Sequence, residues 1–525
     1  MSTEKKNWVY EAKPITVARG VGYGMMDLMG GGWNNIVSGV IFTFLLAQGL
    51  DPSAAGGVTF FARIFDAIFS LFFGTITDEF YKTKLGKRFG RRHFFIFVGG
   101  IAFAIIFPMF WFPASTFGLG GHEFWYYLLV NIGMEIVIAF IMIPWETLPT
   151  EMTEDYNKRT VLSGSRMFIS ATGTAIVFFV LAILKHIGND NAYLITGLIY
   201  TVIFVIAIFI SWRTTWERPL NEDVIAELES RPKLGFVGAA KKSVIDYAST
   251  FKNKAFRKHL TVYLLSFTGK DFYSTLLPTF MVFAVGSAAD FPWVLQALSA
   301  FGILSTLLAA KLMISKGPRF LFILAYSGIL LSLVGYGVTY ATHSLSNVAI
   351  WAFIIISVVY QMSRAVLEFT PWNVFPFIPD VDRIMTREDR AGIYAAVMTF
   401  FRKSTGALAS AIAGILLTEI GFKSDMISGK VPVGITHGIT LIFILGPGIL
   451  ILLALIASFF FRLNKETHTI LKNEINRLEA GGSKEDVTPE TRKVTEALTG
   501  HPYETLWPET PLSLQIAAKE AAAKK

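Results

Sequence analysis

Apolar stretches long enough to cross a membrane recur along the whole chain, and no other feature restricts its fold as strongly. A helix needs ~20 apolar residues to span ~30 Å of hydrocarbon, and about twelve stretches meet that length. Lipid offers no partner to free backbone groups, so we expect every stretch to form an α-helix. The stretches cover residues 24–48, 56–78, 93–114, 123–146, 166–186, 192–212, 260–286, 292–314, 319–341, 346–377, 391–418 and 436–461.

These stretches form two groups, one on each side of a polar segment. The division predicts an all-α membrane protein with about twelve transmembrane helices in two six-helix halves, as in transporters built from two parallel repeats. The expected parts are an N-terminal half at 1–212, a cytoplasmic central loop at 213–259, a C-terminal half at 260–462 and a cytoplasmic tail at 463–525.

Composition excludes several other classes of protein. Hydrophobic residues make up 53% of the chain and charged residues 16%, which is too apolar for a soluble globule of this length. The net charge of +8 does not indicate nucleic acid, because the basic residues lie in short loops where they set orientation in the membrane. The chain has no cysteine, which excludes disulfides and cysteine-based metal sites or nucleophiles.

Alternate loops differ in basic charge, and this difference predicts the orientation of the chain. The loops after the second, fourth, eighth and tenth stretches are basic, with the strongest run at residues 82–92, whereas the intervening loops carry few lysines. The positive-inside rule then places both termini in the cytoplasm. We therefore expect a multi-pass protein of the cell membrane, with the lipid bilayer as a partner.

Charged side chains also occur inside the apolar stretches, where each one costs at least ~2.5 to 3.5 kcal/mol unless it has a partner or a water-filled space. Arg63 and Asp66 share a helix face because they are three residues apart. A structural ion pair and a functional role explain Arg364 with Glu368 equally well. For Glu135 we favour a structural role, because no recognisable motif surrounds it. The other charges are Asp27, Glu146, Arg166, Lys270, Asp271, Arg402 and Lys403.

Five motifs along the chain carry a family resemblance. They are ARIFDAIFSLFFGTITDEFYKTKLGKRFGRR at 62–92, IPWETLPTEMTEDYNKRT at 143–160, SGSRMF at 163–168, IPDVDR at 378–383 and GIYAAVMTFFRKSTGALA at 392–409. In this order they resemble the glycoside-pentoside-hexuronide:cation symporters, the melibiose permease-like family of the major facilitator superfamily. The resemblance implies the major facilitator fold and transport of a sugar with a cation.

The resemblance also implies a substrate site. Asp27 and Arg166 match sugar-contacting residues, and charged groups of these types bind hydroxyls through charge-assisted hydrogen bonds. The aromatic faces of Trp145 and Trp372 can cover the C–H surface of a sugar, although packing or interface anchoring explains both residues about as well. We expect Glu146 and Asp271 to complete this site.

A cation site and a set of gating residues follow from the same comparison. Asp66 matches the first of two carboxylates on the second helix, and Ser70 adds a hydroxyl one turn later. Thr399 and Lys403 match residues of the eleventh helix that face this site from the other half. The residues expected to control the change of conformation are Arg63, Asp78, Arg91, Arg92, Asp380 and Arg383.

The chain departs from the family pattern at four positions. Phe69 and Ser70 stand where sodium-using members have Asn and a second Asp, and Ala139 stands where they have a Thr ligand. Met142 replaces a sugar-binding acid, so galactoside specificity is not supported. Sodium needs several converging oxygens, whereas a proton needs one, so we expect the coupling ion to be H⁺. We expect no metal site and no cofactor.

These observations predict a secondary active transporter that imports a glycoside or small oligosaccharide by symport, and not an enzyme. The alternatives are a sugar uniporter or exchanger without ion coupling, a lipid-carrying relative, and a membrane enzyme that acts on lipid-linked sugars. The last would need a catalytic loop outside the bilayer, and no loop has the required cluster of acids. The tail is too short for a regulatory phosphotransferase domain, and we expect a monomer.

Overall fold

The described part of the chain is helical throughout. The computed structural model describes residues 14–153, 156–217, 244–343, 347–388, 390–428 and 431–512, and it places no strand among them. Seven helical spans in this part are long and apolar enough to cross a membrane by length and composition, and one of them, Phe291–Thr342, contains two of the predicted stretches. The all-α expectation is therefore confirmed. Most of the predicted central loop and the end of the tail lie outside the described residues.

The N-terminal half begins with a broken first crossing. α2 (Val17–Gly24), α3 (Met26–Ile36) and α4 (Phe42–Ala47) follow one another, with the π-helical turn η1 (Val37–Ile41) before α4. The remaining helices of this half are α5 (Pro52–Glu79), α6 (Lys84–Phe89), α7 (His93–Trp111), α8 (Glu123–Met152), α9 (Tyr156–His186) and α10 (Ala192–Thr214). A Cβ atom at Gly24 would lie 2.9 Å from the backbone of α9, so glycine permits α9 to approach the first crossing.

The C-terminal half repeats this pattern with one long kinked helix. Its helices are α13 (Lys254–Thr279), α14 (Phe291–Ala297), α15 (Gly302–His343), α16 (Asn347–Val374), α17 (Ile378–Thr386), α18 (Ala391–Glu419) and α19 (Val433–Phe459). Within α15, Gly317 has a φ of 76°, and Pro318 follows it. This left-handed residue lies in the short basic segment between the eighth and ninth predicted stretches, so the kink in α15 separates these two crossings, the first of which begins in α14.

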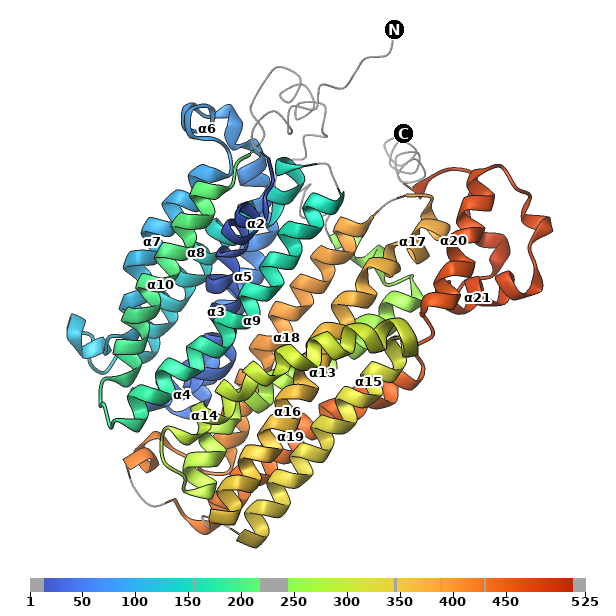
Figure 1. Ribbon diagram of the computed structural model, residues 1–525. Helices are drawn as coiled ribbons and strands as arrows, with labels where there is room; N and C mark the ends of the chain where they lie inside the picture. Colours follow the sequence, from blue (N-terminus) through green and yellow to red (C-terminus); the bar gives the residue numbers. More distant parts are fainter. Residues whose placement is uncertain are drawn as a thin grey trace, which may run out of the picture.

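The two halves lie side by side, α2 to α10 in one and α13 to α19 in the other (Figure 1). They meet mainly where α5 packs against α18 and where α9 packs against α14. A Cβ atom at Gly414 would lie 2.2 Å from the carbonyl oxygen of Pro52, so glycine allows these backbones to touch. Nearby, the backbone N–H of Ser53 donates to Thr418 Oγ1 at 3.1 Å.

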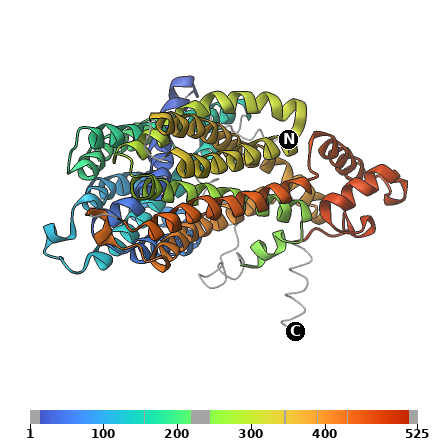
Figure 2. The ribbon, with the colours of Figure 1, turned by 90° about the horizontal axis from the view of Figure 1, so that it is seen from below.

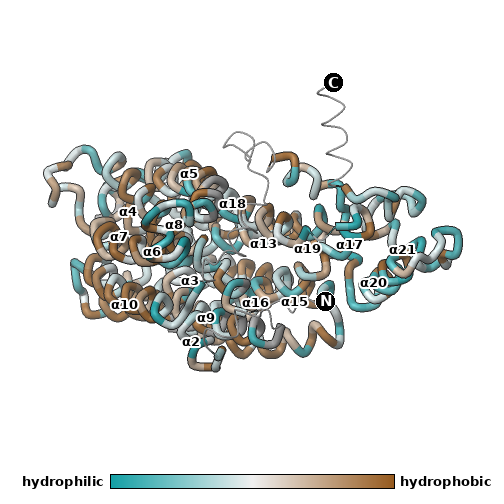
Figure 3. Tube along the Cα trace, turned by 90° about the horizontal axis from the view of Figure 1, so that it is seen from above, coloured by the Kyte–Doolittle hydropathy of each residue, from teal (hydrophilic) through white to brown (hydrophobic). Residues whose placement is uncertain are grey.

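A helical hairpin follows the last crossing and packs beside α17 (Figures 1 and 2). It consists of α20 (Lys465–Glu479) and α21 (Pro489–Thr499). Burial raises the pKa of Glu474, but hydrogen bonds from Arg477 and Tyr503 outweigh that effect and hold the pKa below its ordinary value. The hairpin is largely hydrophilic, whereas α7 and α10 are strongly hydrophobic (Figure 3).

Candidate functional site

Three charged side chains from different helices meet inside the N-terminal half. Arg166 of α9 lies between two carboxylates, with its Nε 2.8 Å from Asp27 Oδ2 and its Nη2 3.1 Å from Glu146 Oε1. Asp27 belongs to α3 and is buried, whereas the side chains of Arg166 and Glu146 are 34% and 47% exposed. The cluster therefore joins a buried acid to groups that remain accessible for hydrogen bonds with a polar solute.

Two stacked aromatic rings pack against the guanidinium of this cluster. The Arg166 guanidinium lies 4.7 Å from the centre of the Trp145 ring, which stacks on Tyr23 with 4.6 Å between centroids. The indole Nε1 of Trp145 donates to the carbonyl oxygen of Tyr23 at 3.1 Å. Because Trp145 is fully buried, its ring in this conformation fixes the position of Arg166 rather than offering a free face.

An ion pair joins the halves at the predicted cation site. Lys403 Nζ of α18 lies 2.7 Å from Asp66 Oδ2 of α5. The Ser70 hydroxyl donates to Asp66 Oδ1 at 2.9 Å and lies 3.1 Å from Lys403 Nζ. Asp66 is 1% exposed, whereas the Lys403 side chain is 25% exposed. A change in the charge of Asp66 would therefore act directly on a contact between the halves.

A second ion pair lies next to the first, and it includes a residue to which the sequence analysis gave no functional role. Arg63 Nε lies 3.2 Å from Glu135 Oε1 of α8, and Arg63 Nη2 donates to Asn34 Oδ1 at 3.2 Å. Glu135 and Arg63 are both buried. In the sequence, the signal for Glu135 was its charge at mid-membrane depth. Its partner Arg63 could not be recognised there, because the two residues are far apart along the chain.

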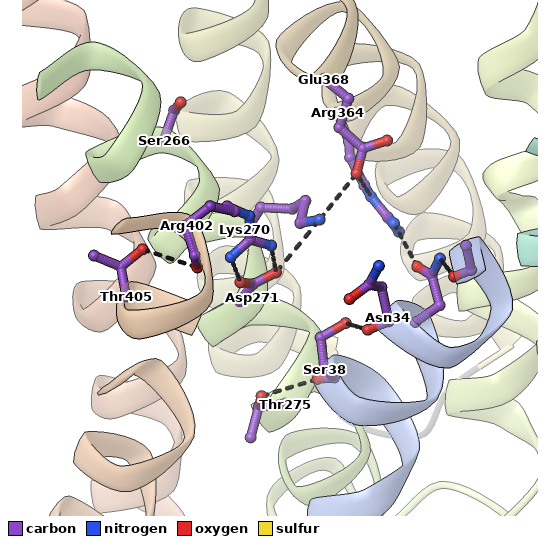
Figure 4. A network of polar contacts seen from close by, with 12 residues as sticks. Asn34, Ser38, Ser266, Lys270, Asp271, Thr275, Arg364, Glu368, Arg402 and Thr405 are labelled. Atoms are coloured by element: carbon purple, nitrogen blue, oxygen red, sulfur yellow. Dashed lines mark hydrogen bonds and ion pairs between the residues drawn. The ribbon is translucent and has the colours of Figure 1, made fainter. Parts of the chain in front are cut away.

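A larger charged network lies in the C-terminal half (Figure 4). Asp271 accepts from Arg402, whose Nη1 lies 2.6 Å from Oδ2, and Lys270 Nζ lies 3.3 Å from Asp271 Oδ1. Lys270 Nζ also lies 3.0 Å from Glu368 Oε1. Arg364 Nε contacts the same oxygen at 3.1 Å, which is the expected i,i+4 pair.

This network also contacts the first crossing of the other half. Arg364 Nη2 donates to Asn35 Oδ1 at 3.1 Å, and the Thr275 hydroxyl donates to the carbonyl oxygen of Ser38 at 2.9 Å. Figure 4 shows that α3 and η1 present these groups toward α13 and α16. Asp271 therefore belongs to a network that faces the N-terminal half, and among the described residues its ion-pair partners are Lys270 and Arg402 rather than Arg166.

Two predicted site residues lie apart from these clusters. Trp372 packs edge-on against Tyr263, with 5.8 Å between ring centroids, and is 40% exposed. Thr399 is exposed one turn before Lys403 on α18. Among the residues that the structure describes, no group of three or more His, Asp or Glu side chains could hold a metal ion.

Two of the predicted gating residues of the N-terminal half, Arg91 and Arg92, pair with one carboxylate. Arg91 Nη2 and Arg92 Nε lie 2.5 Å and 2.7 Å from Glu151 Oε1. The Glu217 carboxylate accepts the backbone N–H groups of Arg91 and Arg92 and thereby caps the start of α7. The side chain of Asp78 lies outside the described part.

Their counterparts in the C-terminal half contact the tail. Asp380 Oδ2 lies 2.8 Å from His468 Nε2, and Asp380 Oδ1 lies 3.4 Å from Lys472 Nζ. Arg383 Nη2 lies 2.6 Å from Glu479 Oε1. A pocket of about 350 Å³ opens beside Asp380 and Arg383. The hairpin of the tail is therefore docked on α17.

Comparison with known proteins agrees with this architecture. Residues 22–465 match the family described as MFS/sugar transport protein. An uncharacterized symporter of Synechocystis sp. is 21% identical over 84% of this chain and 93% of its own length. A glucuronide carrier protein homolog of Escherichia coli is 23% identical over 87% of this chain and 94% of its own length.

The fold also resembles solved transporter structures. The crystal structure of a D-xylose-proton symporter superimposes with a TM-score of 0.55 at 14% identity, over 85% of this chain and 97% of that one. At this level of identity the likeness concerns the fold alone, and it confirms the expected major facilitator fold.

Proposed function

Because this chain belongs to the MFS/sugar transport protein family, we propose that it is a secondary active transporter that imports a glycoside or small oligosaccharide together with a proton. The names of its relatives, symporters and a glucuronide carrier homolog, support a sugar-type solute and coupling to a cation. The finer assignment depends on the two charged clusters of the N-terminal half.

The observation that carries the proposal is the 2.7 Å contact between Asp66 and Lys403, because it links the halves through one titratable acid. Transport by alternating access requires the halves to rock about a central site. A proton on Asp66 would remove the charge that holds Lys403 and so weaken this link. Asp66, Ser70 and Lys403 offer few oxygens for sodium, which favours a proton as the coupling ion.

In this proposal, Arg166 and Asp27 bind the hydroxyls of the solute. Glu146 is the most exposed member of their cluster and can exchange its contact with Arg166 for a solute hydroxyl. The Trp145 ring packs against the Arg166 guanidinium and holds it in place. Trp372 and Asp271 would then contribute from the other half.

Uptake of a panel of radiolabelled methyl glycosides by energised cells tests the proposal. At least one glycoside should accumulate, alkalinise a weakly buffered medium as it enters, and stop accumulating when a protonophore is added. The variant Asp66→Asn should still exchange labelled for unlabelled glycoside but should not accumulate it. Asp190→Asn is the matched control, because this exposed acid lies outside the proposed site.

Two outcomes would contradict the proposal. Accumulation that persists with the protonophore and rises with added sodium would refute the proton as coupling ion. Equilibration without accumulation in the wild type would instead favour the uniporter or exchanger.

A further inference from the structure

Glu135 is a buried acid whose carboxylate is poorly satisfied. It is 1% exposed in the middle of α8. Its one ionic partner among the described residues is Arg63, through Oε1. No hydrogen bond of normal geometry from the described residues reaches Oε2, although the Trp33 indole lies close to the carboxylate. A buried charge with so few partners is costly, so a purely structural role explains it poorly.

Asp66 is better satisfied than Glu135. Its Oδ2 is paired with Lys403 at 2.7 Å, and its Oδ1 accepts the Ser70 hydroxyl at 2.9 Å. Protonating Asp66 would therefore weaken a short ion pair between the halves, whereas protonating Glu135 would weaken the longer Arg63 pair, 3.2 Å, inside the N-terminal half. The two acids differ in the cost of binding a proton, and Glu135 is the less constrained.

The two acids belong to one centre. Arg63, the partner of Glu135, lies three residues before Asp66 on the same face of α5. The charges facing Glu135 are Arg63 and Asp66 from α5 and Lys403 from α18. Arg63 also binds Asn34 of the first crossing. The centre thus contains two carboxylates, two cations, a hydroxyl and an amide, drawn from α3, α5, α8 and α18.

We propose that Glu135 is a second proton-carrying carboxyl of the coupling centre and that Arg63 is the positioning residue between Glu135 and Asp66. The chain has Ser70 where the resembled family has its second helix-two acid, and Glu135 supplies the missing carboxyl from a neighbouring helix. The inference rests on the proposed function, since it assumes that a proton accompanies the solute.

The proton step involves no electron transfer. A hydronium ion on the outer side gives up a proton, so that one of its O–H bonds breaks as an O–H bond forms at Glu135 Oε2, leaving water and a neutral carboxyl. Arg63 then loses its ionic partner on α8 and can turn toward Asp66, which responds by loosening its contact with Lys403. After the halves have rocked, the O–H bond breaks and the proton leaves to water on the inner side.

The test compares cells that produce Glu135→Gln with cells that produce Glu135→Asp. Both are supplied with the labelled methyl glycoside that the wild type accumulates most strongly. Three quantities are measured: exchange of labelled for unlabelled glycoside, the accumulation ratio, and proton uptake caused by adding glycoside. In Glu135→Gln we expect exchange within about twofold of the wild type and loss of proton uptake. The ratio of inside to outside glycoside concentration should be about one. Glu135→Asp should recover part of the accumulation, because it restores a titratable group.

A matched control and a second variant keep the outcome clear. Glu123→Gln makes the same chemical change at the outer end of α8 and should accumulate glycoside like the wild type. If Glu135→Gln fails to reach the membrane because Arg63 is left unpaired, the variant Arg63→Gln/Glu135→Gln removes both charges at once.

Normal accumulation and normal proton uptake in either glutamine variant would overturn the inference while leaving the proposed function intact. A parallel loss of exchange and accumulation in both glutamine variants would also overturn it, because that pattern indicates structural damage. Absence of proton uptake in the wild type would overturn the proposed function and this inference together.

Discussion

The contact between Arg166 and its two acids is specific to a guanidinium. The planar fork of Arg166 reaches Asp27 through Nε and Glu146 through Nη2, and its central carbon lies over the Trp145 ring at 4.7 Å from the centroid. A lysine ammonium is a point charge without this fork and stacks less well on an indole. The geometry of the cluster therefore depends on the shape of this cation as well as on its charge.

Replacing Arg166 with Lys should weaken solute binding while keeping the charge of the cluster. Loss of one charge-assisted contact corresponds to about 1.5 to 3 kcal/mol, or at least about a tenfold rise in the dissociation constant. Binding of a labelled methyl glycoside to purified protein in detergent would measure it. Arg213→Lys is the control, because Arg213 is exposed at the end of α10. Equal affinities in both variants would remove Arg166 from the binding site.

Individual elements also carry interactions that sequence patterns do not reveal. The hairpin of α20 and α21 is tied to α17 by the pairs of Asp380 and Arg383 with the tail. The backbone N–H of Trp507 donates to the carbonyl oxygen of Ile384 at 2.7 Å, and Arg387 donates to the carbonyl oxygen of Pro508. The tail is thus an additional packed layer on the C-terminal half, held by polar contacts at several points.

Reversing one charge of this layer should loosen the hairpin. In Glu479→Lys the ion pair with Arg383 becomes a repulsion, and we expect limited trypsin digestion of purified protein to cut faster within residues 463–512. Glu485→Lys also introduces a lysine that trypsin can cleave after, but at an exposed position, and it serves as the control. If both variants were cut at the same rate, the Arg383 contact would not hold the hairpin in place.

At the scale of the whole molecule, polar contacts between described residues also join the halves away from Asp66 and Lys403. Ser53 of α5 contacts Thr418 of α18 through a 3.1 Å hydrogen bond. His186 Nδ1, at the end of α9, lies 2.8 Å from Asp290 Oδ2, just before α14. These contacts join α5 to α18 and α9 to α14, the same pairs of elements that form the main interface.

A disulfide across this interface should arrest transport reversibly. The natural chain contains no cysteine, so the variant Ser53→Cys/Thr418→Cys introduces the only thiols. Oxidation should stop glycoside uptake because rocking requires the halves to separate here, and reduction should restore it. Each single cysteine variant, oxidised in the same way, should transport normally. Uptake that continues in the fully cross-linked protein would show that this interface does not open during the cycle.

The sequence alone determined the helical segments, because length and hydropathy are local properties. Each apolar segment must satisfy its own backbone hydrogen bonds in the bilayer, which a helix does without help from distant parts of the chain. The order of its motifs also identified the family, which the match over residues 22–465 bears out. Their resemblance placed Asp27 and Arg166 in one site, and the structure brings them within hydrogen-bond distance.

Only the tertiary structure decided the partners of Glu135 and the place of the tail. Arg63 and Glu135 lie on different helices, so their contact depends on how α5 and α8 rotate and pack, which no local pattern encodes. The tail likewise has ordinary soluble helices, and its docking on α17 follows from matching charges that meet only after folding. A buried charge can be recognised from sequence, but its partner is chosen by the packing of helices that are distant along the chain.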